Sequence, residues 1–124
     1  MRVFKTRAFG RFARKARIGD AQLCEAIERA ERGVIDADLG GHVIKQRVAR
    51  PGRGRSGGYR TLIAHHAGTR AVFLFGFAKN AQENIMASDL DDLRRAARSY
   101  MALSGVEIKE AITGGKLTEV DCES

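Results

Sequence analysis

The sequence predicts an α+β fold, and three observations carry this prediction. Apolar residues follow a helical spacing up to Gly33, alternate with a period of two from Gly40, and return to helical spacing after Ser88. Three strand-like segments follow one another in the middle of the chain, which favours an antiparallel meander. The chain has 124 residues, 44% of them hydrophobic, which is enough for one domain with a single core. We therefore expect a central antiparallel sheet, made of a short N-terminal strand and the meander, with helices packed on one face.

The N-terminal part of the chain is expected to form a short strand and two helices. The strand covers residues 2–5, where polar and apolar side chains alternate. Residues 7–17 place their apolar side chains on one face of a helix and cations on the rest. Gly19 interrupts this helix, Asp20 is a suitable N-cap for the second helix, and Gly33 suits the C′ position that ends it.

The meander is expected to consist of strands at residues 42–48, 59–66 and 70–77. Residues 50–58 contain four glycines and a proline, and we therefore predict a loop there. The run Val72–Phe75 is continuously apolar, which is typical of a strand buried on both faces.

Helical spacing returns in the C-terminal part of the chain. Ser88 is expected to begin a helix that Gly105 stops. A short helix over residues 106–112 and a last short strand over residues 117–120 follow.

Positive charge is concentrated in one stretch of the sequence. Between Asp38 and Glu83 there are 44 residues with eight Lys or Arg and no acidic residue. The formal charge is +11 over residues 1–82 and −4 over residues 83–124. Ordinary surfaces mix the two signs, and a nearby carboxylate would compete with phosphate for a cation. This asymmetry favours a polyanionic partner, and we interpret it as RNA.

Three of these cations are candidates for one surface on adjacent predicted strands. Lys45 and Arg47 share one face of the first meander strand, and Arg60 lies on the second. If the register brings them together, they form a rigid cationic surface. Arg60 interrupts a half-buried pattern, and an arginine in that position needs a negatively charged partner. A buried ion pair with a helical carboxylate and a phosphate clamp are both consistent with the sequence.

Three further candidates flank the predicted strands. Lys79 and Asn80 directly follow the third strand, where a side chain is held firmly and stays exposed. The alternative for both is a polar strand terminator. Tyr59, next to Arg60, has two interpretations, which are stacking on a nucleobase and cross-strand packing; the pattern favours packing.

The glycine-rich segment formally matches G-x-G-x-x-G over residues 52–57. A strand rather than a helix follows it, which excludes a dinucleotide-binding turn. We expect a mobile basic arm whose cations contact RNA phosphates, with Arg50, Arg53 and Arg55 as the candidates. The alternative is a solvated hairpin loop.

Neither a metal site nor a cofactor site is expected. His65 and His66 are adjacent and therefore point to opposite faces of a strand, and His42 completes no metal-ligand spacing. Cys24 and Cys122 are the two cysteines, and they do not form a disulfide framework in this interpretation. A reducing, cytoplasmic location follows. No apolar run approaches membrane-spanning length, so no membrane partner is expected.

Two segments, Gly40–Leu62 and Phe75–Asn80, together with the opening Met1–Thr6, carry a family resemblance. They resemble the RelE/HigB family of toxins from bacterial type II toxin–antitoxin modules, and within it a HigB-like branch. The likeness covers residues 1–120, which we take as one toxin domain followed by a tail at residues 121–124.

This resemblance implies a small α+β fold with a central antiparallel sheet. It also implies a messenger-RNA endoribonuclease that usually acts on the translating ribosome, needs no metal, and is neutralised by a cognate antitoxin, commonly of the helix-turn-helix type. The family arginine of the middle strand corresponds to Arg60, a later cationic position to Lys79, and the basic residues of the preceding strand to Lys45 and Arg47. The C-terminal catalytic tyrosine of some relatives has no match in this sequence.

The expected reaction uses the nucleophile of the RNA itself. The 2′-hydroxyl attacks the adjacent phosphate, which gives a 2′,3′-cyclic phosphate and a 5′-hydroxyl. Arg60 would clamp the phosphate, and Lys45 or Lys79 would be the base. Two other classes stay open. One is a ParE-like poison of DNA gyrase that acts through protein contacts, and the other is a degenerate toxin that only binds nucleic acid or its antitoxin.

Overall fold

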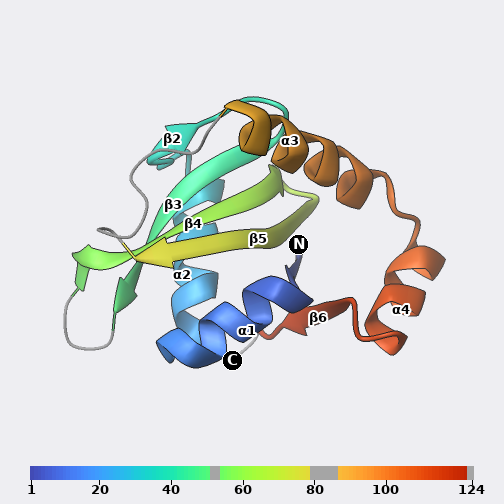
Figure 1. Ribbon diagram of the computed structural model, residues 1–124, viewed down its shortest axis with the longest axis horizontal. Coiled ribbons are helices and arrows are strands. Elements are labelled where there is room, and N and C mark those ends of the chain that lie inside the picture. The colour runs from blue at the N-terminus through green and yellow to red at the C-terminus, as the bar shows by residue number, and fades with distance from the viewer. Residues whose placement is uncertain (51–53, 79–86, 123–124) are drawn as a thin grey trace.

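The computed structural model describes residues 1–50, 54–78 and 87–122, and Figure 1 shows its ribbon. Two helices follow the first strand, four strands form the middle of the described chain, and two helices precede the last strand, which is the predicted α+β arrangement. The elements are β1 (Arg2–Thr6), α1 (Arg7–Ala16), α2 (Asp20–Glu31), β2 (Ala37–Asp38), β3 (Val43–Arg50), β4 (Gly54–His66), β5 (Arg70–Ala78), α3 (Ala87–Ala102), α4 (Gly105–Thr113) and β6 (Leu117–Val120).

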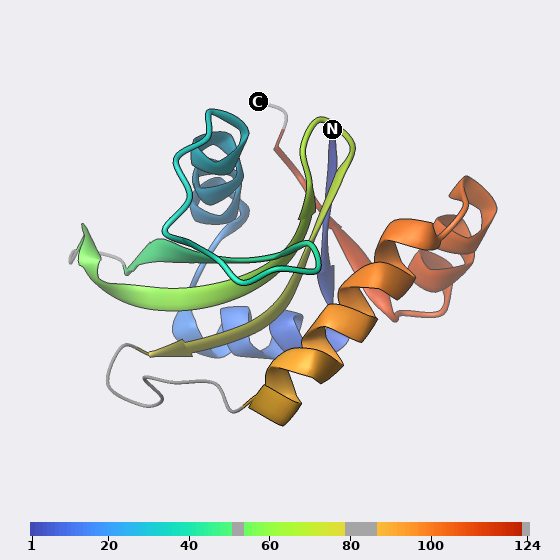
Figure 2. The same cartoon turned by 90° about the horizontal axis from the view of Figure 1, so that it is seen from above.

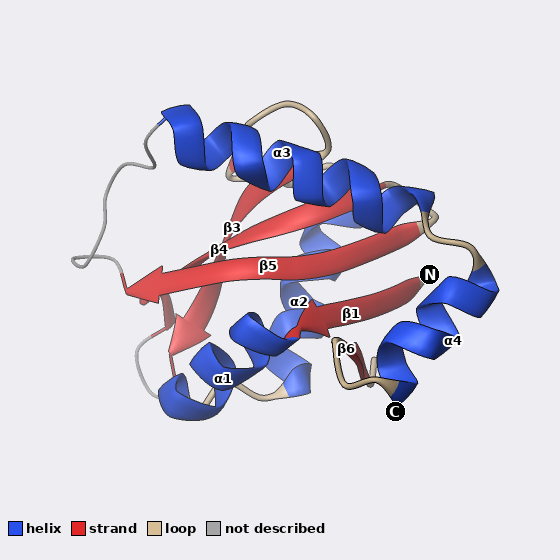
Figure 3. Cartoon of the chain, turned by 45° about the vertical axis from the view of Figure 1, so that its right-hand side comes forward, coloured by secondary structure: helices blue, strands red, loops and turns tan. Residues whose placement is uncertain are grey.

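The described residues form one sheet of six strands in the order β2-β3-β4-β5-β1-β6. The predicted antiparallel meander is confirmed, because β4 pairs antiparallel with both β3 and β5. β1 runs parallel to β5 and antiparallel to β6, so the two terminal strands lie side by side (Figure 3). The last strand was expected from the sequence, whereas the two-residue β2 was not.

Helices cover both faces of the sheet, which corrects the prediction that they lie on one face. The helices α1 and α2 pack against the face that carries Ile63 and Phe73, which we call the α1/α2 face. The helices α3 and α4 pack against the opposite face, which carries Leu62 and Val72 and which we call the α3/α4 face. Figure 2 shows α2 and α3 on opposite sides of the curved sheet. The central strands carry apolar side chains on both faces, and each apolar face is shielded from water by packing against a pair of helices.

The first two helices begin and end close to the predicted positions. The Thr6 hydroxyl caps α1 by accepting a hydrogen bond from the Phe9 N–H at 3.1 Å. Gly19 occupies the N-cap of α2, so Asp20 is the first helical residue rather than the predicted cap. Gly33 follows α2 with a φ of 83°, which fits the predicted C′ role.

Strand pairing continues into the glycine-rich segment, so the loop prediction is wrong for Arg50 and for residues 54–58, while residues 51–53 lie outside the described residues. β3 extends to Arg50, β4 begins at Gly54, and these two residues pair with each other. The register shifts between Val48 and Arg50, which marks a bulge. A Cβ on Gly58 would lie 2.1 Å from the Val48 carbonyl oxygen, so the backbones approach too closely for any other residue. The glycine serves strand packing here.

The C-terminal helices divide at Ser104. Its hydroxyl accepts from the Glu107 N–H at 3.1 Å, and the Glu107 carboxylate accepts from the Ser104 N–H at 2.8 Å. This capping box begins α4 at Gly105, which the sequence had predicted as the end of the preceding helix. None of the helices within the described residues has the length and apolar character needed to span a bilayer.

Cys24 and Cys122 form a disulfide, with their Cα atoms 5.5 Å apart, which corrects the expectation that they are unpaired. The bond ties the residues after β6 to α2. The N–H of Asp121 strengthens this attachment by donating to the Asp20 carboxylate at 2.9 Å. The cysteines are separated by 98 positions, so their spacing gave no indication of pairing. Because the two cysteines are paired, they no longer indicate a reducing compartment.

Candidate nucleic-acid interface

The β3–β4 ladder brings three predicted cations to one face of the sheet. Arg47 pairs directly opposite Arg60, and Lys45 pairs opposite Leu62 at the next same-face position. Alternate residues of a strand point to the same side, so all three cations share the α3/α4 face. We call Lys45, Arg47 and Arg60 the cationic patch.

Arg60 is half-buried, and its guanidinium has no hydrogen-bond or ion-pair partner among residues 1–50, 54–78 and 87–122. The Nη1 atom is buried and makes no hydrogen bond, and no described residue forms an ion pair with this side chain. A buried guanidinium without a partner costs free energy, and like charges directly opposite each other destabilise a sheet. The geometry therefore favours an external anion over a helical carboxylate as the partner of Arg60.

Arg47, in contrast, is partly neutralised by Asp36. Its Nη2 lies 3.3 Å from Asp36 Oδ1, and its backbone N–H donates to Asp36 Oδ2 at 2.7 Å. Partial burial raises the pKa of Asp36, but the hydrogen bonds and charge of Arg47, with the charge of Arg29, outweigh burial and lower this pKa. Asp36 precedes the acid-free stretch, and the short pairing of β2 with β3 brings it beside the patch.

A buried polar network fixes Arg47 and Asp36 in place. Arg29 is 3% exposed, and its Nη2 donates to the Arg47 carbonyl while its Nε donates to Glu25 at 2.8 Å. The fully buried Gln46 amide donates to the Ala26 carbonyl at 3.0 Å and accepts from the Asp36 N–H at 2.8 Å. These bonds join α2 to β3 beneath the patch, so the strand that carries Arg47 is held rigidly.

Tyr59 lies on the opposite face from the cationic patch. Its ring meets Phe12 of α1 edge-on, with centroids 5.3 Å apart and an interplanar angle of 88°. Gly76 makes room for Phe12, because a Cβ there would lie 2.3 Å from that ring. This geometry favours packing over base stacking for Tyr59.

A bulge in β5 determines which aromatic rings accompany the patch. Leu62 pairs with Phe75 and Ile63 pairs with Phe73, so Leu74 is an extra residue in β5. After the bulge, Phe75 shares a face with Leu62, which is the α3/α4 face.

Phe75 and Phe77 both lie on the side of the patch. Phe77 is buried and pairs opposite Arg60, and its ring centroid lies 5.9 Å from that of Phe75. Phe75 is 39% exposed, so the predicted burial of the run Val72–Phe75 fails at its last residue. The sequence could not indicate this exposure, because a continuously apolar run contains no sign of the bulge.

Comparison with known proteins identifies the family. The family model described as the RelE toxin of the RelE / RelB toxin-antitoxin system matches residues 1–120. The chain belongs to the RelE toxin family. This confirms the resemblance seen in the sequence, while the HigB-like branch stays a prediction. A search of the curated proteins gave no match.

Several predicted site residues of this RelE-family toxin fall outside the side chains that the structure describes. Arg53, Lys79 and Asn80 lie outside the described residues. Arg50 and Arg55 belong to β3 and β4, where only their backbone is described. Their proposed contacts with RNA stay predictions.

The three histidines of this RelE-family toxin border one pocket at the other end of the ladder, with a volume of about 590 Å³. His65 Nε2 lies 2.6 Å from Glu31 Oε2, and the other Glu31 oxygen accepts from the Gly68 N–H at 2.9 Å. Burial raises the pKa of Glu31, but hydrogen bonds from His65 and Gly68 outweigh it and lower this pKa. These contacts attach α2 to the β4–β5 turn. The described residues contain no cluster of His, Cys, Asp or Glu placed to hold a metal ion.

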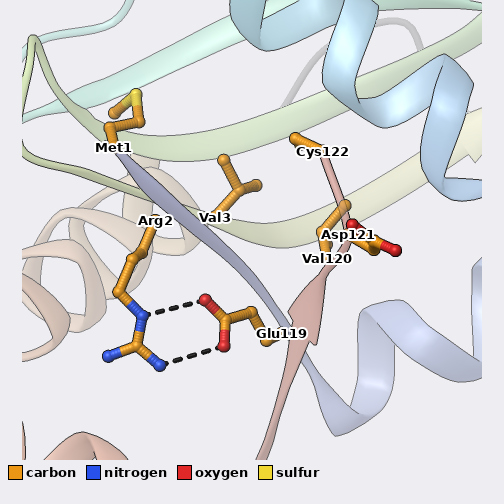
Figure 4. A pocket seen from close by; sticks show the side chains of 7 residues that line it. All are labelled: Met1, Arg2, Val3, Glu119, Val120, Asp121 and Cys122. Carbon is orange, nitrogen blue, oxygen red and sulfur yellow. Dashed lines mark hydrogen bonds and ion pairs between the residues drawn. The ribbon is translucent and has the colours of Figure 1, made fainter. Parts of the chain in front are cut away.

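A second pocket lies between the terminal strands (Figure 4). Its cation, Arg2, donates to both oxygens of Glu119, from Nε at 2.8 Å and from Nη2 at 3.0 Å. Arg2 is therefore satisfied by a bidentate pair, unlike Arg60. This contact joins β1 to β6, and we assign it a structural role.

Proposed function

We propose that this RelE-family toxin is a metal-independent messenger-RNA endoribonuclease that inhibits translation and growth. The observation that carries the proposal is the guanidinium of Arg60, whose buried Nη1 has no hydrogen-bond partner in the described part of the chain. Arg60 faces Arg47 and lies diagonally across the ladder from Lys45. Phosphate oxygens are suitable partners for guanidinium groups, because the planar fork offers paired donors.

The proposed reaction needs no nucleophile from the protein. The 2′-oxygen forms a bond to phosphorus, the bond from phosphorus to the 5′-oxygen breaks, and a 2′,3′-cyclic phosphate results. Arg60 holds the scissile phosphate, and Arg47 adds positive charge as the pentavalent transition state gains negative charge. Lys45 is placed to take the proton of the 2′-hydroxyl. Lys79, which follows β5, is the alternative base and a candidate donor to the 5′-oxygen.

The proposed partners are messenger RNA, the translating ribosome and a cognate antitoxin, and the proposed location is the cytoplasm. The family description names a toxin–antitoxin system, which supports the antitoxin. The ribosome, and an antitoxin of the helix-turn-helix type, are carried over from the resemblance to relatives.

The direct test is Arg60→Gln, with Arg2→Gln as the matched control. We expect Arg60→Gln to abolish growth inhibition and RNA cleavage. Its thermal stability should be equal or higher, because the change removes a half-buried charge that faces Arg47. Arg2→Gln changes an exposed, paired arginine on β1 and should retain full activity.

Growth inhibition, cleavage of messenger RNA both free and on translating ribosomes, and thermal unfolding would be measured on both variants. A folded Arg60→Gln protein that stays fully toxic would contradict the proposal. If the wild type inhibits DNA gyrase supercoiling and leaves RNA intact, the toxin instead acts as a ParE-like poison.

A further inference from the structure

Phe75 is an exposed aromatic ring beside the cationic patch. Of the large apolar side chains that the described residues expose, which are Met1, Val34, Phe75 and Val106, it is the one aromatic. It sits on β5, where it pairs with Leu62 of β4 two positions beyond the end of the β1 pairing at Phe73, so the ring is presented by a strand rather than a loop. Exposing an apolar ring on a rigid strand has a free-energy cost, and a ligand that covers the ring would offset that cost.

The register fixes the position of this ring relative to Arg60. Phe75 pairs opposite Leu62, and Arg60 pairs opposite Phe77, so Phe75 and Arg60 are diagonal neighbours on one face. Diagonal neighbours lie about 7–8 Å apart. The buried Phe77 ring supports Phe75 from the side, at a centroid separation of 5.9 Å.

We propose that Phe75 forms a nucleobase-binding subsite beside Arg60. A base next to the scissile phosphate stacks on the exposed ring while the phosphate contacts the Arg60 guanidinium. A nucleotide combines a flat π face with an anion, and this surface offers an aromatic ring and an unpartnered cation at matching spacing. The inference rests on the proposed ribonuclease function and adds to it the group that positions the substrate.

The charge around the ring favours RNA over a protein segment as its occupant. Lys45 lies across β4 from Phe75 in the same cross-strand row, and Arg60 and Arg47 fill the next row. The other exposed apolar side chains lie on other elements or at the N-terminus, so they do not extend this surface into an apolar groove. Every base has a π face, so this subsite contributes binding and positioning rather than codon selection.

The experiment compares the full-length wild type with Phe75→Leu, which removes the aromatic face at similar volume, and with Phe75→Trp, which keeps it. Val106→Ala is the matched control, because Val106 is an exposed apolar residue on α4, far from the patch in the sheet order. Cleavage by the wild type is first mapped on a single-stranded RNA. The same RNA is then made with 2′-deoxyribose at the cleaved position, so that it binds without reacting, and with 2-aminopurine beside that position.

We expect Phe75→Leu to weaken RNA binding about tenfold and to remove the quenching of 2-aminopurine fluorescence. The dependence of binding on salt should be unchanged, because stacking releases no counterions. Phe75→Trp should bind RNA at least as tightly as wild type, and this variant tests the proposal even if Phe75→Leu does not fold. Val106→Ala should match the wild type in every measurement.

The inference is overturned if the wild type cleaves RNA while Phe75→Leu binds and quenches like the wild type. It is also overturned if Phe75→Leu loses only antitoxin binding, which would assign the ring to the antitoxin interface. A wild type that neither binds nor cleaves RNA, whether the RNA is free or bound to translating ribosomes, overturns the proposed function itself, so the two failures are distinguishable.

Discussion

Arg47 on β3 pairs opposite Arg60 on β4, and a described carboxylate forms an ion pair with only the first of these two cations. Asp36 pairs with Arg47, and no described carboxylate pairs with Arg60. The net positive charge is therefore concentrated at Arg60. An RNA phosphate bound there would supply the negative charge that the protein does not.

Asp36 gives this arrangement a pH dependence. The pKa of Asp36 is lowered from 3.8 in the folded protein. The ionised carboxylate is therefore more stable in the folded state than in the unfolded chain. The stabilisation is complete above the unfolded pKa and is lost as the pH falls through the folded pKa. Asp36→Asn should lower the free energy of unfolding by about 1–3 kcal/mol at pH 7.

Urea unfolding of the wild type and Asp36→Asn at pH 7 and at pH 3 would measure this difference. We expect the gap between the two proteins to narrow at the lower pH. A gap of equal size at both values would show that the ionised carboxylate of Asp36 is not what stabilises the fold.

At the scale of elements, the β3–β4 ladder and its glycines hold the candidate site. The backbone of Gly58 lies against the Val48 carbonyl at the bulge, immediately before Tyr59 and Arg60. A methyl group there meets backbone atoms, which cannot rotate away as a side chain can.

Gly58→Ala should therefore destabilise the protein by about 1–3 kcal/mol and reduce RNA cleavage by shifting Arg60. Gly105→Ala is the matched control, because nothing lies within 4 Å of a Cβ at Gly105 and the residue is helical. Alanine at that position should be neutral or slightly stabilising. Denaturant unfolding would compare the free energies of unfolding of Gly58→Ala and Gly105→Ala. Equal stabilities would contradict the close approach at Gly58.

At the scale of the whole molecule, the Cys24–Cys122 disulfide closes a loop of 98 positions. A cross-link over such a loop stabilises a protein by about 4–5 kcal/mol in the chain-entropy model. Cys122→Ser should lower the midpoint of guanidinium unfolding, and a reductant should bring the wild type down to the same midpoint. If the reductant leaves the wild-type midpoint unchanged, the disulfide does not contribute to stability.

The meander and the shared face of the cationic patch could be predicted from the sequence. The period of two is strong over residues 42–48 and 59–66, and alternation alone places Arg47 and Lys45 on one side of a strand. The α+β class follows from the change of period at Gly40.

Other features depend on long-range pairing that no local pattern encodes. Asp36 reaches Arg47 through the short strand β2, and the Cys24–Cys122 bond joins distant segments. The exposure of Phe75 depends on a single extra residue in β5. The extension of β3 to Arg50 and of β4 back to Gly54 depends on close backbone contacts, whereas composition alone predicted a loop there.

The most direct test of the central claim is chemical analysis of the RNA ends that the purified toxin produces on messenger RNA bound to translating ribosomes. If the cationic patch around Arg60 directs attack by the 2′-hydroxyl, the products carry 2′,3′-cyclic phosphate and 5′-hydroxyl ends, and Arg60→Gln yields none. Products with 3′-hydroxyl and 5′-phosphate ends, or wild-type cleavage by the folded Arg60→Gln protein, would contradict the account.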